Sequence, residues 1–197
     1  MKKILLGGLA VFAAIVLVFV IAVAMQPSEF RIERSTTMAA APAEIFPHVN
    51  DFHNWDAWSP WIKLDPEAKA TFEGPTEGKD AVFRWSGNDD IGEGSMTIVE
   101  SKPDERIRIR LDFVRPMAGT SDAEFTFVPA GETTKVTWAM MGKNDFIGRA
   151  VCMFMNMDKM LGEKFDEGLA SMKKAVESSP VNHADGEAQT PTKGDPS

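Results

Sequence analysis

The sequence is short of cysteine and of positive charge. Cys152 is the only cysteine among the 197 residues, so the chain alone forms neither a disulfide nor a cysteine-based zinc or iron–sulfur site. All 29 acidic residues lie at Glu29 or later, and the formal net charge is −8. Because the positive charges of Lys2 and Lys3 precede an apolar run, the rest of the chain carries −10. A surface of that sign repels phosphates, which argues against a nucleic-acid partner.

Several catalytic and metal-binding patterns are also missing. The sequence has no His-Glu-x-x-His run and no glycine-rich phosphate loop. His48 and His53 are five positions apart, whereas ligands on one helical face are three or four apart, so we interpret them as surface histidines rather than metal ligands. Ser171 and Lys174 match Ser-x-x-Lys by chance, because its partner motifs are absent. We therefore expect no metal and no cofactor.

An apolar run from Ile4 to Met25 follows the two lysines. As a helix of about 22 residues it would span about 33 Å, against roughly 30 Å of bilayer hydrocarbon. We expect a transmembrane anchor over residues 1–26, with the N-terminus cytoplasmic and the domain on the extracytoplasmic side. The alternative is a signal peptide cleaved after Ala24, because Ala22 and Ala24 fit a cleavage site, although the usual apolar core is shorter.

The body, residues 29–177, is predicted to be one α+β domain, followed by a disordered acidic tail over residues 178–197. A first strand over residues 30–38 precedes a helix start at Pro42, which Pro47 shortens. Alternation of apolar and polar residues then predicts an antiparallel meander. The alternating segments are residues 81–85, 95–98, 106–113, 123–127 and 135–140.

One long helix is predicted at the end of the body. Asn144 and Asp145 are good capping residues, and the stretch from there to about Glu177 contains no proline. Its apolar residues recur at spacings of three and four, which predicts a helix of about 50 Å. Since one helix covers a curved sheet of six or seven strands incompletely, we expect a cavity between the sheet and this helix.

Four segments and the terminal helix carry a family resemblance. The segments are residues 41–46, 54–61 (Asn-Trp-Asp-Ala-Trp-Ser-Pro-Trp), 84–88 and 92–98. Over about residues 29–177 the chain resembles the polyketide cyclase/dehydrase-like members of the START and birch-pollen-allergen (SRPBCC) superfamily. The resemblance implies a helix-grip fold, in which a curved antiparallel six- to seven-stranded sheet wraps around a long C-terminal helix. It also implies a hydrophobic pocket, used by different members for lipids, sterols, hormones, polyketides or catalysis, and fold analogy does not choose among these.

The candidate ligand-binding residues fall on one parity of the strands or on the facing side of the predicted helix. Each is open to a second interpretation as plain core, since most buried apolar residues only pack. Methionine favours the cavity, because twelve are present and flexible thioethers suit varied apolar partners. The candidates are Trp58, Phe83, Trp85, Met96, Ile98, Ile109, Leu111, Phe113, Phe125, Phe127, Trp138 and Met140 before the helix, and Met153, Phe154, Met157 and Leu161 on it.

Other side chains have simpler interpretations. Trp55, Trp58 and Trp61 either clamp the short helices onto the sheet, which we favour, or form an aromatic lip at the pocket. Five charged residues would supply acid–base groups if they faced the cavity, but strand parity places them outside. These are Arg84, Arg108, Arg110, Asp112 and Glu124.

A binding role follows as the favoured hypothesis. We expect a membrane-anchored, non-enzymatic protein that binds a lipid or other small hydrophobic molecule between the sheet and the terminal helix. One alternative is a cyclase/dehydrase-like enzyme that uses the same cavity. Another is a scaffold or partner-binding envelope protein with a filled core.

Overall fold

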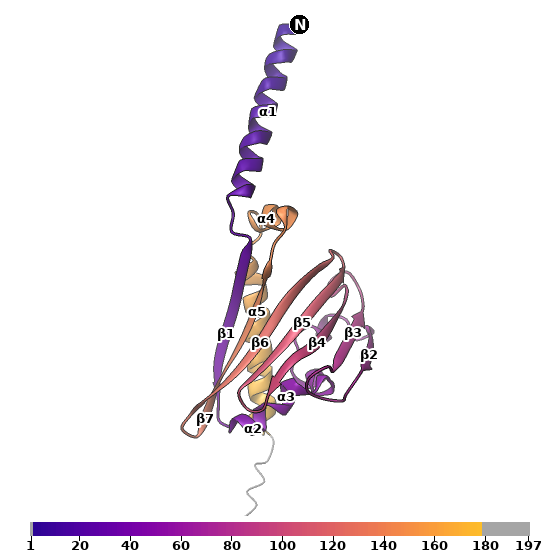
Figure 1. Cartoon of the computed structure of the whole chain (residues 1–197), viewed down its shortest axis with the longest axis vertical. Helices are drawn as coiled ribbons and strands as arrows, with labels where there is room; N and C mark the ends of the chain where they lie inside the picture. Colours follow the sequence, from indigo (N-terminus) through magenta and orange to yellow (C-terminus); the bar gives the residue numbers. More distant parts are fainter. Residues whose placement is uncertain (1, 179–197) are drawn as a thin grey trace, which may run out of the picture.

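A computed structural model describes residues 2–178, which Figure 1 shows. Helix α1 (Lys2–Ala24) stands clear of the body at the N-terminus. Its stretch Leu6–Ala24 is long and apolar enough to cross a membrane, a test of length and composition that a signal sequence also passes. Apart from Ser178, the predicted tail lies outside the described residues.

The body is built on one seven-stranded antiparallel sheet. From edge to edge the strand order is β1-β7-β6-β5-β4-β3-β2. The strands are β1 (Glu29–Met38), β2 (Lys69–Glu73), β3 (Val82–Ser86), β4 (Glu93–Lys102), β5 (Arg106–Arg115), β6 (Gly119–Ala130) and β7 (Thr133–Lys143). The predicted meander is confirmed from β3 to β7. The sequence pattern did not predict β2. All five of its residues are exposed, so the strand has no buried face to produce alternation.

Alternation separates the two faces of the sheet. On β5, Ile107 and Ile109 are buried. Arg110, which lies between Ile109 and Leu111, is exposed. Arg110 pairs with Asp112 on the outer face, at 2.9 Å, and Arg84 pairs with its cross-strand neighbour Glu73 at the same distance. The prediction that the charged residues of the strands lie outside is confirmed at these positions.

Helices cover the inner face of the sheet. The first group follows β1 and comprises α2 (Pro42–Ile45), α3 (Pro47–Asn50) and the 3-10 helices η1 (Phe52–Ala57) and η2 (Ile62–Leu64). The second group follows β7 and comprises α4 (Phe146–Cys152) and α5 (Met157–Ser178). Helix α5 lies along β1, α2 and α3 lie at the end of the sheet far from α1, and α4 lies beside the C-terminal end of α1 (Figure 1).

A long C-terminal helix is present as predicted, but it begins at Met157 rather than just after Asp145. Asp145 caps α4 as expected, since its carboxylate accepts a hydrogen bond from the Gly148 N–H at 2.7 Å. The chain then leaves the helix after Cys152, and the Asn156 side chain accepts from the Lys159 N–H at 3.0 Å, which starts α5. Helix α5 therefore measures about 33 Å rather than 50 Å. Residues 153–156 lie in the break between α4 and α5, so they do not occupy the positions that a continuous helix would give them.

An aromatic cluster fills the space between the sheet and its cover. The Trp138 ring centroid lies 4.3 Å from that of Phe165 on α5, 4.9 Å from Phe125 on β6 and 5.6 Å from Trp58. Trp58 and Phe125 are fully buried. These rings contact one another directly, so this part of the inner face is packed core.

The first two tryptophans of residues 54–61 act as the clamp that we favoured. The Trp55 N–H donates to the Val49 carbonyl at 3.1 Å, and the Trp58 N–H donates to the His48 carbonyl at 2.8 Å. Both indoles are buried, and both polar edges are satisfied by α3. Their burial and hydrogen bonds tie the short helices to the sheet.

Two glycines let α5 approach the sheet closely. A Cβ added at Gly168 would lie 2.9 Å from the Trp138 ring and 3.1 Å from Pro60. The Arg34 guanidinium lies against Gly162 in the same way. Because there is no side chain at either position, the helix packs closely on the aromatic cluster at Gly168 and on Arg34 of β1 at Gly162.

Candidate functional site

Burial of the inner face falls toward the end of the sheet nearest α1. On β5, Ile107 and Ile109 are fully buried, whereas Leu111 and Phe113 are partly exposed. The direction is the same on α5, where Met157 and Leu161 in the first turns are partly exposed and the inward residues from Phe165 onward are buried. The helix seals the far end of the sheet and leaves the α1-proximal end less covered.

We call the partly exposed apolar residues at this end the apolar mouth. All of them pack against the buried core on one side. They come from β1, β3, β5 and α5, so the mouth is formed by both the sheet and the helix. The mouth consists of Phe30, Trp85, Leu111, Phe113, Met157 and Leu161.

Glycines hold two rings of the mouth against the sheet. The Trp85 ring lies over Gly94 of the neighbouring strand, where an added Cβ would be 2.7 Å from it. Phe30 lies over Gly142 in the same way, at 2.9 Å. The Trp85 N–H also donates to the Ile91 carbonyl at 3.0 Å. These contacts fix the rings, and both side chains remain partly exposed.

Most of the predicted ligand-binding residues lie on the inner face. The strand residues Phe83, Trp85, Met96, Ile98, Ile109, Leu111, Phe113, Phe125, Phe127, Trp138 and Met140 share it, and Trp58, Met157 and Leu161 pack against it from the cover. Their position is as predicted, and their role in binding stays a prediction. Phe30 was missed, although it belongs to the alternating first strand.

The predicted position of Met153 and Phe154 is wrong. Both lie in the break between α4 and α5 rather than on the inward side of a continuous helix. Phe154 is 78% exposed, and its ring stacks on Phe19 of α1 with centroids 6.4 Å apart. The helical spacing grouped Met153 and Phe154 on one apolar face. In the structure these residues lie beside α4 and α1 instead of against the sheet.

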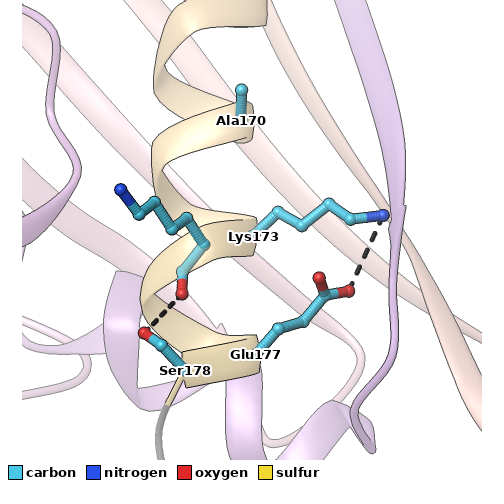
Figure 2. Close-up of a pocket in the computed structure, with 5 residues that line it drawn as sticks. Ala170, Lys173, Glu177 and Ser178 are labelled. Carbon is cyan, nitrogen blue, oxygen red and sulfur yellow. Dashed lines mark hydrogen bonds and ion pairs between the residues drawn. The ribbon is translucent and has the colours of Figure 1, made fainter.

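The best-formed hollows among the described residues are open surface grooves rather than an enclosed cavity. One, of about 360 Å³, lies on the last turns of α5, where Lys173 and Glu177 form an ion pair at 3.6 Å (Figure 2). Lys173 and Glu177 also bind the backbone of residues 37 and 39. This groove therefore marks where α5 is attached to β1.

The second groove, of about 560 Å³, lies at the α1-proximal ends of β1, β7 and β6. Most of its lining has the outward strand parity, and an ion pair between Glu29 and Lys143, at 3.0 Å, borders it. Its charged lining does not suit an apolar ligand.

Arg34 is a charged residue with inward parity on β1, on the same side of the strand as the buried Ile32. Its guanidinium donates to both carboxylate oxygens of Asp158, at 3.2 Å each, and lies 3.4 Å from Asp166. The hydrogen bond from Arg34 holds the pKa of Asp158 below its ordinary value, against the opposing effect of desolvation. Both acids are on α5, so the cluster fastens the helix to β1 and supplies no free acid or base at the mouth.

His48 and His53 lie in different surroundings. The His53 Nδ1 is 2.7 Å from the Asp51 carboxylate, and its ring stacks on Phe72. Burial lowers the pKa of His48, whose Nδ1 is buried without a hydrogen-bond partner. Within residues 2–178, no group of three or more His, Cys, Asp or Glu side chains is placed to hold a metal ion.

Solved structures of low sequence identity share this architecture. A protein from Thermobifida fusca is 19% identical with a TM-score of 0.58, and the match covers 74% of this chain and 92% of that one. The di-domain ARO/CYC StfQ from the steffimycin biosynthetic pathway is 12% identical with a TM-score of 0.57, over 76% of this chain and 51% of that one. A protein from Chromobacterium violaceum is 15% identical with a TM-score of 0.54, over 77% and 99%.

Sequence comparison assigns the family. No curated protein sequence is significantly similar to the chain. The model of the family described as "Polyketide cyclase / dehydrase and lipid transport" matches residues 29–177, which is the whole helix-grip body from the first residue of β1 to the penultimate residue of α5. The resemblance noted in the sequence is thus confirmed, and the chain belongs to this polyketide cyclase/dehydrase and lipid transport family.

Proposed function

We propose that the protein is a membrane-anchored binding module that holds a lipid or other small hydrophobic molecule at the apolar mouth. The observation that carries the proposal is the uneven burial of the inner face, where most of the partly exposed apolar side chains lie toward the end nearest α1. Helix α1 would retain the body at the bilayer, with Lys2 and Lys3 on the cytoplasmic side. The family description, which includes lipid transport, supports the same class of ligand.

The geometry favours entry from the membrane side. Residues 25–28 connect α1 to β1, and the Asn144 N–H donates to the Ser28 carbonyl at 2.7 Å, which shortens the tether further. A molecule leaving the bilayer would meet Leu111, Phe113 and Met157 before any part of the packed core. Burial of about 300 Å² of its apolar surface would contribute about 7.5 kcal/mol before the entropy cost of association.

The ligand would occupy only the α1-proximal half of the inner face, since the aromatic cluster around Trp138 fills the other half. Arg34 on β1 and Arg115 at the end of β5 have the parity of the inward apolar residues, and both already pair with carboxylates. This arrangement supports binding over acid–base catalysis. The packed core is also what the scaffold hypothesis predicts. The experiment below distinguishes the binding hypothesis from the scaffold hypothesis.

Native mass spectrometry of the full chain, extracted from its membrane in mild detergent, tests the proposal. We expect a bound apolar molecule that survives removal of the detergent and is displaced by a fluorescent fatty acid. A full chain that neither retains nor takes up any apolar molecule would rule out the binding role and leave the scaffold hypothesis. A mature mass about 24 residues lower would rule out the anchor separately.

A further inference from the structure

The segment from α4 to the start of α5 exposes a group of large apolar side chains, which we call the apolar wedge. Ile147 is 63% exposed and Phe154 is 78% exposed. Arg149 is the only charged residue between positions 146 and 155, in a body that carries −10. The wedge consists of Phe146, Ile147, Met153, Phe154 and Met155. An apolar surface of this kind needs a partner.

Contacts with α1 determine the height of the apolar wedge along the axis of α1. The Phe154 ring stacks on Phe19, and Val23 is fully buried where α1 and α4 meet. Phe19 lies five residues before Ala24, which is about 7.5 Å along the helix axis. If α1 spans the bilayer, Phe154 therefore lies below the headgroups. This depth matches the roughly 5–10 Å to which interfacial helices bury their apolar face.

Arg149 marks the polar boundary of the wedge. Its Nη1 donates to the Ala24 carbonyl at the C-terminal end of α1, at 3.2 Å, and its guanidinium lies 5.9 Å from the centre of the Phe146 ring. A cation at a helix C-terminus is favourable because it offsets the partial negative charge there. An arginine beside an aromatic ring is also typical of the level where a membrane helix leaves the hydrocarbon.

We propose that the apolar wedge inserts into the outer half of the bilayer beside α1 and is a second membrane contact of this protein. The inference rests on the anchoring part of the proposed function and is independent of ligand binding. Its occupant is lipid, because the wedge is continuous with the apolar surface of α1 and lies at the same level. Two contacts would fix the orientation of the body and turn the apolar mouth toward the bilayer.

The single native cysteine provides the test. Cys152 is exposed at the end of α4 and can carry an environment-sensitive fluorophore in the full-length protein. The labelled protein is placed in phosphatidylcholine vesicles that contain doxyl-labelled lipid, and quenching is compared with that by aqueous iodide. The matched control is Cys152→Ser with Glu132→Cys, which moves the label to the β6–β7 turn at the far end of the sheet.

We expect at least threefold stronger quenching by doxyl lipid at Cys152 than at position 132, with the reverse order for iodide. Quenching by iodide alone at both positions would overturn the proposal. Protection of Cys152 from both quenchers would also overturn it, because a second copy or another protein would then cover the wedge. Resistance of the protein to alkaline carbonate extraction, measured on the same vesicles, shows separately whether α1 anchors the chain.

A pair of variants tests the wedge itself. Phe154→Ser removes its most exposed ring, whereas Val128→Ser makes a similar change on the outer face of β6, where the side chain is 55% exposed. We expect the Phe154 variant to lose at least half of the doxyl quenching at Cys152 and the Val128 variant to keep it. Equal quenching in both variants would contradict insertion, and unchanged far-ultraviolet circular dichroism confirms that both are folded.

Discussion

Trp138 on β7 and Phe165 on α5 stack nearly parallel, with ring centroids 4.3 Å apart and an angle of 14° between the planes. The contact is possible because Gly168, one turn further along α5, brings the helix backbone close to the same indole. This stack joins the covering helix to the central aromatic cluster. Its consequences are measurable as stability, independently of any ligand.

Removal of the Phe165 ring should destabilise the fold strongly. Phe165 is 1% exposed, and Phe165→Ala would leave a cavity against Trp138 and Trp61. We expect a loss of about 3–5 kcal/mol in the free energy of unfolding, measured by urea denaturation in detergent. Met160→Ala on the same helix, where the side chain is 49% exposed, should cost less than about 0.5 kcal/mol. Similar losses in the two variants would show that α5 is not docked through Phe165.

A side chain at Gly168 should force the helix away from the sheet. Gly168→Val places new atoms against Trp138 and Pro60, and overpacking of this kind costs about 1–3 kcal/mol. Ala170→Val is the matched control, because Ala170 is exposed on the same helix and the change introduces the same β-branched residue. The difference between the two unfolding free energies measures the close approach. A control that is destabilised as much as Gly168→Val would show that the close approach at Gly168 does not decide the loss.

The ion pair of Arg34 predicts a pH dependence at low pH. The hydrogen bond from Arg34 lowers the pKa of Asp158 from its ordinary value of 3.8, so the folded state favours the carboxylate more than the unfolded state does. The stabilisation is present above about pH 4 and is lost as the pH falls through the lowered pKa. Arg34→Gln should raise the pKa of Asp158 and flatten this part of the stability profile. Carboxyl NMR titration measures the pKa, and an unchanged value in the variant would show that the pair does not form in solution.

His48 predicts a pH dependence nearer neutrality. Burial lowers its pKa from the ordinary value of 6.5, so the unfolded chain takes up a proton at a higher pH than the folded protein does. The contribution of His48 to stability is therefore complete above pH 6.5 and declines as the pH falls below it. We expect His48→Gln to reduce the fall in melting temperature between pH 7.5 and pH 5.5. A variant with the same fall as the wild type would show that His48 does not cause this pH dependence.

Polar substitution at the apolar mouth should weaken ligand retention without unfolding the domain. Leu111 faces inward and is partly exposed, whereas Val128 is exposed on the outer face. We expect Leu111→Gln to reduce the retained ligand at least tenfold in native mass spectrometry, because an amide without a partner would meet an apolar molecule. Val128→Gln should retain the wild-type amount. Equal retention by both variants would place the ligand elsewhere or remove it from the protein.

The fold was predictable because its signals are local and repeated. The alternation around Ile107 and Ile109 needs only a half-buried strand, and Pro42 and Asp145 mark helix starts by their own chemistry. The order of the elements followed from these signals along the chain, and the resemblance then implied the helix-grip fold. The inner-face parity of the candidate residues followed from the same alternation.

The filled core and the break before α5 were not predictable from these signals. A glycine such as Gly168 gives no periodic signal, yet it decides whether the helix stands off the sheet or lies on it. Met153 and Phe154 continue the helical spacing, and no proline marks the break that contains them. The partner of Phe154 is Phe19, more than a hundred residues earlier in the sequence. Periodicity identifies an apolar side but does not identify the surface that it meets.

The pairing of β1 with β7 has a consequence for how the chain assembles. Glu29 pairs with Lys143 and Met38 with Thr134, so β1 is synthesised about a hundred residues before the strand that completes its hydrogen bonds. Until then, the segment that follows α1 has an open edge and no partner. Closure of the domain therefore waits for the last strand, and a nascent chain halted before residue 133 would present this edge to any chaperone within reach.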